Sequence, residues 1–273
     1  MRETFRLWRC PHCLGIHAAD EVDLDHYYGS YPFHATPKLD WVTKAMLGNQ
    51  LVRLRRAGLK KHHHVLDHGC GNGSFVEFLR ASGYVNAVGY DQYAERFRDP
   101  SLLEKTYDFV LSQDVIEHVA EPWDLLREFD RLVRPNGIVA IGTPNSEDID
   151  LKNPDASVHA LHQPYHRHIM SKKTVFTLAA PLGWELVRYY STMFTNTLIP
   201  GANLRFVEHY LRMNDDTADL GFERIHFENP AFWSWKTMYL ALFGYFNAPE
   251  LAFMAVFRVL PKVQQLPARG DAA

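Results

Sequence analysis

The chain has 273 residues, enough for one large domain or two small ones. It carries 29 Lys and Arg against 32 Asp and Glu, and a formal charge of −3 does not favour a nucleic-acid binder that relies on net charge. Three cysteines do not make a disulfide scaffold, so we expect a cytoplasmic protein. The N-terminus lacks the apolar run of a signal peptide, and the most apolar uncharged stretch, residues 237–249, is shorter than the roughly 20 residues of a membrane span.

Residues 1–60 are predicted to form an N-terminal arm that ends in a helix over residues 39–57. Apolar side chains recur there at helical spacing before Gly58. The arm opens with a Cys-x-x-Cys motif, which is half of a zinc site; the alternative interpretation is an arm with two free thiols. The two cysteines and the histidines that are candidates to complete a zinc site are Cys10, Cys13, His12, His17, His26 and His34.

Residues 61–262 are predicted to form a larger domain, in which strands alternate with helices. A short strand over residues 65–66 leads into a glycine turn over residues 69–73, and the spacing of Ser74 and Glu77 predicts a capping box and a helix. This alternation is typical of a parallel sheet covered on both faces. Further strands are predicted over residues 87–90, 109–111, 138–141, 184–190 and 251–259, and further helices after Pro122 and over residues 171–180.

Two segments depart from the alternation. We interpret residues 193–250 as a helical insertion before the last strand and residues 263–273 as a flexible tail. The insertion is rich in Phe, Trp and Tyr, which favours a lid over an apolar or aromatic substrate pocket. The alternatives are a helix packed on the domain, a dimer contact, or shallow docking on a membrane surface by Trp233 and Trp235.

The glycine turn does not match the common phosphate-binding patterns. The sixth position counted from Gly69 is Ser74 instead of the glycine of a dinucleotide fingerprint, and no Gly-Lys-Ser/Thr loop is present. Asp67 repels a pyrophosphate, whereas it suits a ligand that carries an ammonium and a sulfonium. Asp91, at the end of the next strand, can accept hydrogen bonds from both ribose hydroxyls. The combination predicts an S-adenosylmethionine site.

Four segments resemble, in order, motifs of class I S-adenosylmethionine-dependent methyltransferases. Residues 65–73, VLDHGCGNG, resemble the first motif, and residues 107–119, YDFVLSQDVIEHV, resemble the motif of the fourth strand. Residues 132–137, LVRPNG, resemble the turn before the fifth strand. Residues 164–171, PYHRHIMS, are similar to the segment after the fifth strand in the branch that includes ubiquinone-biosynthesis O-methyltransferases. The resemblance is specific for fold and cofactor and not for the substrate.

The resemblance implies an α/β fold with a Rossmann-like, doubly wound, seven-stranded, mostly parallel sheet whose last strand is antiparallel. Only 16 residues separate Asp91 from Asp108, so the third strand is expected to be short or missing, with Asp99 as the candidate adenine contact. The cofactor-binding residues that the resemblance implies are Asp67, Gly69 and Gly71 at the methionine end, Cys70 in the same turn, Asp91 at the ribose, Gln92 along the adenine, and Gln113 and Asp114 beside the methionine moiety.

Histidines after the fourth and fifth strands are the candidate bases. Methyl transfer from a sulfonium is a direct displacement, so alignment lowers the barrier by about 7–11 kcal/mol and a base is needed only when the nucleophile arrives protonated. Histidine titrates near neutral pH, and both segments lie on the side of the sheet where this fold binds substrates. We predict His118, His166 and His168 as catalytic, with His162 nearby; the alternative is that they only hydrogen-bond loop backbone.

A divalent metal is a second hypothesis for the same region. Two acids and two imidazoles, Asp114, Glu117, His118 and His166, can hold an ion against a substrate oxygen, in an arrangement similar to that of small-RNA 2′-O-methyltransferases. The same Asp-Val-Ile-Glu-His motif also occurs in relatives that use no metal, so no metal ligand is assigned at this stage.

The sequence therefore predicts an S-adenosylmethionine-dependent methyltransferase that acts on a small molecule, with oxygen as the preferred methylated atom. The acceptor is expected to be partly apolar or aromatic, and a homodimer is the assembly considered. Two alternatives stay open: a metal-assisted RNA 2′-O-methyltransferase, and a cofactor-binding partner subunit that has lost the transfer step.

Overall fold

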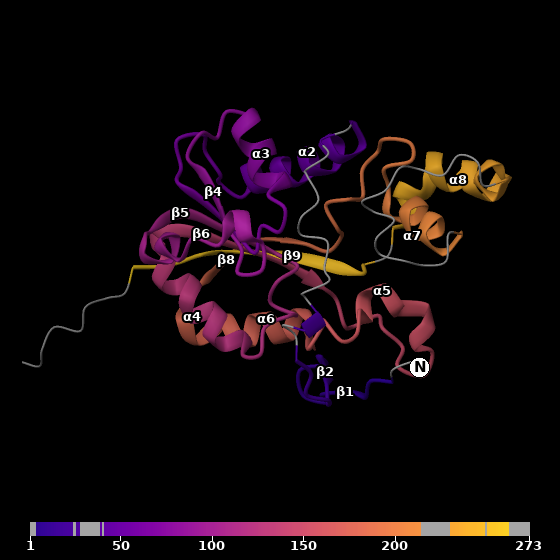
Figure 1. The fold of residues 1–273 in the computed structure, drawn as a ribbon, viewed down its shortest axis with the longest axis horizontal. Helices are drawn as coiled ribbons and strands as arrows, with labels where there is room; N and C mark the ends of the chain where they lie inside the picture. The colour runs from indigo at the N-terminus through magenta and orange to yellow at the C-terminus, as the bar shows by residue number, and fades with distance from the viewer. Residues whose placement is uncertain are drawn as a thin grey trace, which may run out of the picture.

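The computed structural model describes residues 4–23, 26–27, 39, 41–213, 230–248 and 250–261. A six-stranded sheet with helices on both faces forms the body of the protein, and a three-stranded sheet lies beside it (Figure 1). Parts of two predicted segments lie outside the described residues: residues 28–38 of the arm, including His34, and residues 214–229 of the lid. The whole predicted tail over residues 263–273 also lies outside them.

The strands of the main sheet lie in the order β4, β3, β5, β6, β9, β8. β3 pairs in parallel with β4 and β5, and β5 pairs in parallel with β6, whereas β9 is antiparallel to both β6 and β8. The predicted α/β class, mostly parallel sheet and antiparallel last strand are therefore confirmed. The strands are β3 (Val65–His68), β4 (Ala87–Tyr90), β5 (Tyr107–Gln113), β6 (Val133–Pro144), β8 (Glu185–Tyr190) and β9 (Ala252–Arg258).

The main sheet has six strands where the resemblance implied seven. Two short 3-10 helices, η1 (Glu95–Phe97) and η2 (Pro100–Glu104), occupy the segment between β4 and β5, so β4 is an edge strand. Asp99 accepts a hydrogen bond from the backbone N–H of Ser101 and thereby caps η2. The segment between the strands is too short to hold both a strand and its crossover, and it folds as tight helical turns instead.

Helices cover both faces of the main sheet (Figure 1). The helix α2 (Trp41–Arg56) matches the predicted N-terminal helix and lies with α3 (Ser74–Ala81) on one face. On the other face lie α4 (Pro122–Leu132), which begins at Pro122 as predicted, and α6 (Lys172–Ala179). The sheet is thus the middle layer of three, which is the arrangement that buries both faces of parallel strands.

Successive residues of β5 serve opposite layers of the core. Phe109 is buried in the apolar cluster that includes Leu79 of α3, whereas Val110 is buried in the cluster that includes Leu126 and Phe129 of α4. Side chains of a strand alternate between its faces, and burial of each large apolar side chain stabilises the fold by about 1.5–3 kcal/mol. This packing holds the carboxyl end of β5 in a fixed position at the edge of the sheet.

The predicted capping box of α3 does not form. The N-cap is Gly73, in the left-handed region, and Asn72 Oδ1 accepts hydrogen bonds from both the backbone N–H and the hydroxyl of Ser74. Glu77 forms an ion pair with Arg96 of η1 instead, at 2.9 Å. The turn residue Asn72 takes the capping role because a glycine N-cap has no side chain to offer.

A second sheet connects the N-terminal arm to the body. The hairpin of β1 (Leu7–Arg9) and β2 (Ile16–Ala18) pairs antiparallel with β7 (His168–Ile169), so the arm lies against the segment that follows β6. The predicted insertion is helical, with α7 (Leu204–Met213) and α8 (Trp235–Phe243) at one end of the protein (Figure 1). Within the described residues, no helix combines the length and apolarity needed to cross a membrane.

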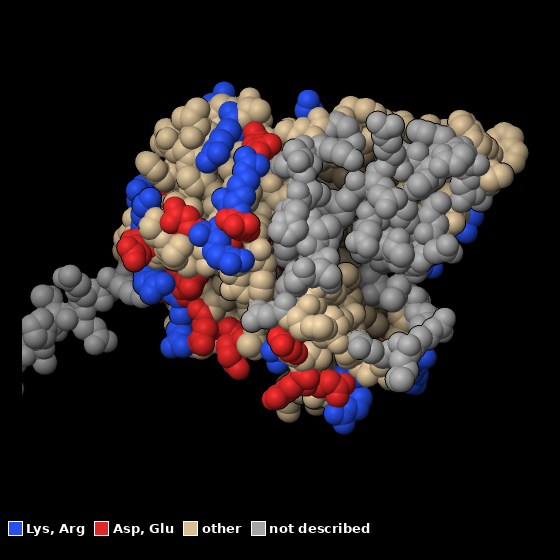
Figure 2. All heavy atoms as spheres, in the orientation of Figure 1, with Lys and Arg blue, Asp and Glu red and all other residues tan. Residues whose placement is uncertain are grey.

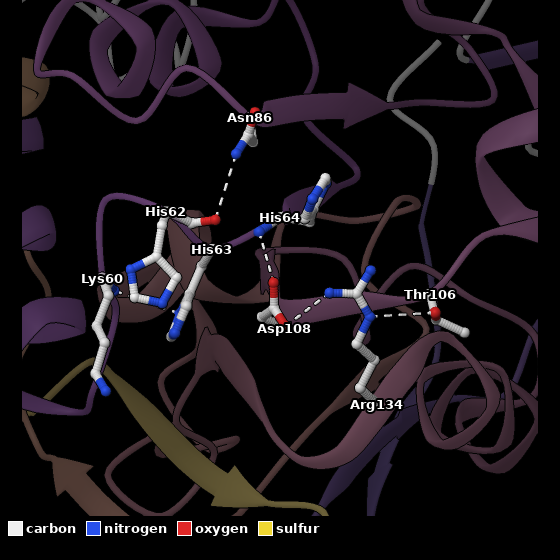
Figure 3. A network of polar contacts seen from close by, with 8 residues as sticks. All are labelled: Lys60, His62, His63, His64, Asn86, Thr106, Asp108 and Arg134. Atoms are coloured by element: carbon white, nitrogen blue, oxygen red, sulfur yellow. Dashed lines mark hydrogen bonds and ion pairs between the residues drawn. The ribbon is translucent and has the colours of Figure 1, made fainter.

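A polar network ties the strands together at the edge of the sheet where β5 and β6 begin (Figure 3). Asp108 accepts hydrogen bonds from the backbone N–H of His64 and from Arg134 Nη1, each at 2.8 Å. Burial acts to raise the pKa of Asp108, but the hydrogen bonds from His64 and Arg134 outweigh it and hold the pKa below its usual value. The network lies at the beginning of β5, the opposite end of that strand from Gln113, and has a structural role.

Replacement of Asp108 tests this role. We expect Asp108→Asn to lower the free energy of unfolding by on the order of 1 kcal/mol at pH 7, because the ion pair is partly exposed and screened by solvent. The folded pKa is lowered, so the contribution of Asp108 is present above its unfolded value of about 3.9 and is lost as pH falls through the folded pKa. Urea unfolding at pH 7 and pH 3 measures both effects. A variant as stable as the wild-type protein at pH 7 contradicts the role.

Candidate active site

A cavity of about 410 Å³ opens at the carboxyl ends of β3, β4 and β5. Parallel sheets of this class bind ligands at that edge, because backbone turns and helix N-termini converge there. The walls are the glycine turn, the end of β4, the end of β5 and one residue of the segment after β6. The residues that line it are His68, Gly69, Gly71, Tyr90, Asp91, Gln92, Tyr93, Asp114, Val115, His118, Val119, Ala120 and Arg167.

Asp91 holds the glycine turn in place. Its Oδ2 accepts a hydrogen bond from the backbone N–H of Gly71 at 2.9 Å, and its Oδ1 accepts two more, from Tyr93 at 2.8 Å and Ala94 at 3.0 Å. The carboxylate is 6% exposed and borders the cavity. It therefore fixes the turn against β4 and presents its remaining lone pairs to a ligand.

Glycine is required at position 69 of this turn. Gly69 has φ +78°, and a β-carbon there would lie 2.2 Å from Val115 Cγ2. A side chain at this position is therefore excluded by both the backbone conformation and the close approach of the segment after β5.

Asp67 lies behind the turn and does not line the cavity. It is buried at the end of β3, and burial together with the charge of Asp91 raises its pKa to about 7. A buried carboxyl beside a second acid resists ionisation unless positive charge arrives. Cys70 and Gln113 are likewise not among the residues that line the cavity, and burial raises the pKa of the Cys70 thiol.

Asp114 faces the cavity from the end of β5. Its φ of +54° is unusual for a residue other than glycine, and such strain is found most often at functional sites. The side chain is exposed at the cavity, and desolvation by the surrounding protein raises its pKa to about 6 against a hydrogen bond from Gln113 Nε2. Asp114 can therefore accept positive charge from a bound ligand.

Glu117, His118 and His166 bring three ligand atoms within 4.8 Å of one another. Glu117 is fully buried: Oε2 accepts a hydrogen bond from Thr143 Oγ1 at 3.0 Å, while Oε1 has no hydrogen-bond partner within the described structure. Burial and the charge of Asp114 raise the pKa of Glu117 well above its usual value. A buried carboxylate oxygen without a partner is costly, which suits a bound cation.

Both histidines of this cluster are neutral. Burial lowers the pKa of His118 to about 4, and burial also lowers the pKa of His166 well below its usual value. His166 Nδ1 donates to the carbonyl of Ala160 at 2.8 Å, and His118 makes a hydrogen bond to the backbone of Tyr165. Each neutral ring therefore keeps one nitrogen lone pair, and backbone bonds of this kind orient metal-binding imidazoles.

Hydrogen bonds to the backbone of Glu117 hold His166 next to His118. The Glu117 carbonyl accepts hydrogen bonds from the N–H groups of Arg167, at 2.7 Å, and His168, at 3.1 Å. These bonds join the segment after β5 to the segment after β6, and the rings of His118 and His166 meet edge to face with centroids 4.7 Å apart.

His168 occupies a different environment from the one predicted. Its Nε2 donates to the carbonyl of Ala120 at 3.0 Å, and its Nδ1 lies 3.0 Å from Nδ1 of His17 in the small sheet. Both ring nitrogens are thus engaged outside the cavity lining, so the geometry does not support His168 as a base. Asp99 likewise lies away from the cavity, as the cap of η2.

The structure adds cavity residues that the sequence analysis missed. Arg167 lines the cavity directly after His166, and Tyr93 follows the predicted Gln92. His68 lies in the first motif and forms an ion-pair contact with Glu128 of α4 at 3.0 Å. All three are neighbours of predicted positions. Their place beside a motif, rather than their residue type, is the sequence feature that could have identified them.

The described part of the insertion contributes no residue to the cavity lining. Helix α8 instead exposes most of its apolar side chains, and Thr237 is its one buried residue within the described side chains. Trp235 is 92% exposed and Trp233, in η6 (Pro230–Trp233), is 63% exposed. The lid therefore stays a prediction for this segment.

Comparison with known families identifies the class of the protein. A family model described as "Methyltransferase domain" matches residues 46–189, which is more than half of the chain and includes every element that forms the cavity. The chain belongs to this methyltransferase family, and the expected class I resemblance is confirmed for family and fold.

Curated relatives match only part of their length. The ubiquinone biosynthesis O-methyltransferase of Caulobacter vibrioides is 32% identical over 102 residues, which cover 30% of this chain and 40% of the relative. The protein of the same name from Sodalis glossinidius is 30% identical over 130 residues, which cover 40% of this chain and 49% of the relative. This chain thus spans about half or less of the length of these two relatives.

A solved structure shares the fold at low sequence identity. Phosphoethanolamine N-methyltransferase 2 of Haemonchus contortus, in complex with S-adenosyl-L-methionine, aligns with a TM-score of 0.50 and 15% identity, over 90% of this chain and 62% of that chain. At this identity the likeness concerns the fold alone.

The buried carboxyl behind the turn makes a testable prediction. We expect Asp67→Asn to raise the free energy of unfolding of the ligand-free protein by about 2–4 kcal/mol at pH 8. The pKa of Asp67 is raised from about 3.9 in an unfolded chain to about 7, so ionisation opposes folding. The penalty is absent below pH 4, grows as pH rises and is complete above pH 7, and the benefit of Asn follows the same course.

Urea unfolding between pH 4 and pH 8 measures this effect. Asp108→Asn is the matched control, because the pKa of Asp108 is lowered and its replacement should destabilise the protein at the same pH. If Asp67→Asn is no more stable than the wild-type protein at pH 8, the ionised carboxyl of Asp67 does not destabilise the fold and the prediction is wrong.

Proposed function

We propose that the protein transfers a methyl group from S-adenosylmethionine to an oxygen atom of a small molecule. The observation that carries the proposal is a cavity lined by the glycine turn, Asp91 and Asp114 on one side and by His118, beside Glu117 and His166, on the other. The family match supports methyl transfer, and the names of the curated relatives support oxygen as the methylated atom.

One side of the cavity suits the methyl donor. The close backbone of the glycine turn, which Asp91 holds through the N–H of Gly71, fits the methionine moiety, and the remaining lone pairs of Asp91 fit the ribose hydroxyls. The ammonium and sulfonium of the donor would bring positive charge toward Asp67 and Asp114 and so favour the ionised forms of these acids, whose pKa values are raised to about 7 and about 6. The donor supplies an electrophilic methyl group and leaves as a neutral thioether.

The acceptor side lies at His118. The methyl carbon forms a bond to the acceptor oxygen as the bond from carbon to sulfur breaks, and the hydroxyl proton must leave the acceptor. His118 has a pKa of about 4, so proton transfer to it from a phenol of pKa about 10 is uphill by about 8 kcal/mol. A lone imidazole at this position is therefore a weak base, and a second means of acidifying the acceptor is favoured.

The cluster of Glu117, His118 and His166 fits a divalent cation. It offers one carboxylate and two neutral imidazoles, and the unpartnered Glu117 Oε1 provides the charge that an ion needs. A cation held there would lower the pKa of an acceptor hydroxyl, which is the contribution that His118 alone lacks. We include the metal in the proposal on this geometry, whereas the sequence alone left it as a hypothesis that was not favoured.

An acceptor with apolar or aromatic character fits the remaining wall, where Val115, Val119, Tyr90 and Tyr93 lie. A homodimer and a cytoplasmic location stay predictions.

The RNA alternative shares the metal cluster. On the face in Figure 2, however, basic and acidic side chains are interspersed among the described residues, whereas a surface that binds nucleic acid is mainly basic. Detection of a methylated product with any acceptor would exclude the alternative of a partner subunit without transfer activity.

Binding of S-adenosylhomocysteine tests the donor side. We expect micromolar binding by calorimetry, and Asp91→Ala should weaken it about tenfold or more, because the variant loses the ribose acceptor and the anchor of the glycine turn. Asp99→Ala is the control: it removes an acid from the same segment but one that caps η2 outside the cavity, so affinity should be unchanged. No binding to the wild-type protein would overturn the proposed function.

Glu117→Gln tests the acceptor side. In transfer assays with labelled S-adenosylmethionine and a panel of phenols, we expect the variant to lose about 100-fold or more in kcat/KM while S-adenosylhomocysteine binding is retained. The amide keeps the shape of the side chain and its contact with Thr143 but removes the charge that would hold a cation. A chelator should lower wild-type activity to the level of the variant and leave the variant unchanged. Full activity in Glu117→Gln contradicts a role for the cluster.

A further inference from the structure

The Cys-x-x-Cys motif of the arm lies outside the cavity, on the turn that joins β1 to β2. Cys10 and Cys13 are free thiols and both are partly exposed. The turn is closed by backbone hydrogen bonds of 2.9 Å from Cys10 N–H to the carbonyl of Gly15 and from Leu14 N–H to the carbonyl of Cys10.

Side chains from elsewhere in the fold hold the three carbonyls of this turn. The carbonyl of Cys13 accepts hydrogen bonds from Ser171 Oγ and Thr174 Oγ1 at the start of α6, and that of His12 accepts one from Lys173 Nζ. The carbonyl of Leu14 accepts hydrogen bonds from Arg9 Nη1 at 2.8 Å and Ser146 Oγ at 2.9 Å. The turn is thus fixed to the body of the domain at every carbonyl from residue 12 to residue 14.

The cysteine side chains of this turn interact with its own backbone and with each other. The pKa of Cys10 is lowered, chiefly by the nearby backbone of Cys13 and His12 and by the Cys13 thiol. Leu14 has φ +64°, a strained value for a residue with a branched side chain, and it is retained because both ends of the turn are held. N–H groups aimed at a sulfur atom stabilise the thiolate form, which is the form that binds metals.

His17 on β2 presents a lone pair toward this turn. His168 Nε2 lies 3.0 Å from the carbonyl of Ala120, which can only accept, so that nitrogen carries the proton. Nδ1 of the neutral His168 is then an acceptor, and His17 must donate to it from its own Nδ1 at 3.0 Å. Burial lowers the pKa of His17, so its ring is neutral and Nε2 keeps an unprotonated lone pair.

Gly15 shows that this lone pair and a thiol face the same space. A β-carbon at Gly15 would lie 3.2 Å from His17 Nε2, 3.3 Å from Thr174 Oγ1 and 3.5 Å from Cys13 Sγ. The imidazole, the sulfur and the hydroxyl of Thr174 therefore border the same position, which a glycine keeps free of a side chain. The three ligand atoms do not all lie within 4.8 Å of one another, so ion binding requires a shift of the turn or of the His17 ring.

We propose that Cys10, Cys13 and His17 bind a thiophilic divalent cation of the zinc class, with the fourth position open to solvent. Two thiolates and a neutral imidazole balance the charge of the ion, and binding releases the thiol protons that remain to the solvent. The ion would connect the β1–β2 turn to β2, whose pairing with β7 positions the segment that carries His166 and Arg167. This site is independent of the proposed methyl transfer.

Cobalt binding tests the site. Metal-free full-length protein that carries Glu117→Gln, to remove the other candidate cluster, is titrated with Co²⁺ alone under reducing conditions. We expect one equivalent to produce the ultraviolet sulfur-to-metal charge-transfer absorption and the visible bands of tetrahedral cobalt, both displaced by Zn²⁺. Cys10→Ser and Cys13→Ser in this background should abolish the charge-transfer absorption, and His17→Gln should weaken Zn²⁺ binding at least tenfold in competition with a chelating dye.

His12→Gln is the matched control, because His12 lies in the same motif, is exposed and is not a proposed ligand. It should bind both ions as its parent does, and circular dichroism confirms that each variant is folded. The proposal is overturned if no charge-transfer absorption appears, if the absorption survives in Cys10→Ser and Cys13→Ser, or if His12→Gln loses as much affinity as His17→Gln. Loss of Co²⁺ binding here leaves S-adenosylhomocysteine binding and methyl transfer as separate results.

Discussion

The burial of acidic side chains at the carboxyl edge of the parallel sheet is the constraint on which the site depends. Asp67 and Glu117 are buried and Asp114 is exposed at the cavity, and desolvation by the surrounding protein raises the pKa of each. Such groups cost stability in the empty protein, and only positive charge or hydrogen-bond donors offset that cost. In the proposed function, the sulfonium and ammonium of the donor would offset the cost at Asp67 and Asp114, and a cation would offset it at Glu117. The proposal therefore draws ligand affinity from acids that are destabilised in the empty site.

Backbone hydrogen bonds convert this edge into one connected site. Asp91 holds the glycine turn through Gly71, and the carbonyl of Glu117 holds the segment after β6 through Arg167. The same segment continues into β7, which pairs with the N-terminal hairpin and its cysteine turn. The acceptor side of the cavity and the proposed metal turn thus share one short stretch of chain, although they lie in different sheets.

Sequence patterns predicted the donor side of the site better than the acceptor side. Of the predicted cofactor-binding residues, Gly69, Gly71, Asp91, Gln92 and Asp114 border the cavity, because they directly follow strands whose ends are set by a local pattern, whereas Asp67, Cys70 and Gln113 do not line it. Their role in binding stays a prediction. His168 and the capping box of α3 did not follow their patterns. The reason is competition: Ala120 and His17 take both nitrogens of His168, and Asn72 takes the N–H that a capping residue would have served.

The sequence by itself determined the family, the order of strands and helices, and the glycine turn that borders the cavity, because these depend on residues close together in the chain. The short chain segment between Asp91 and Asp108 also predicted that the third strand is short or missing. Only the tertiary structure decided that His166 meets His118 and that His17 faces the cysteine turn, since both contacts join segments that are distant along the chain. Such convergence depends on strand register and on which backbone groups are already bonded, and neither leaves a periodic signal in the sequence.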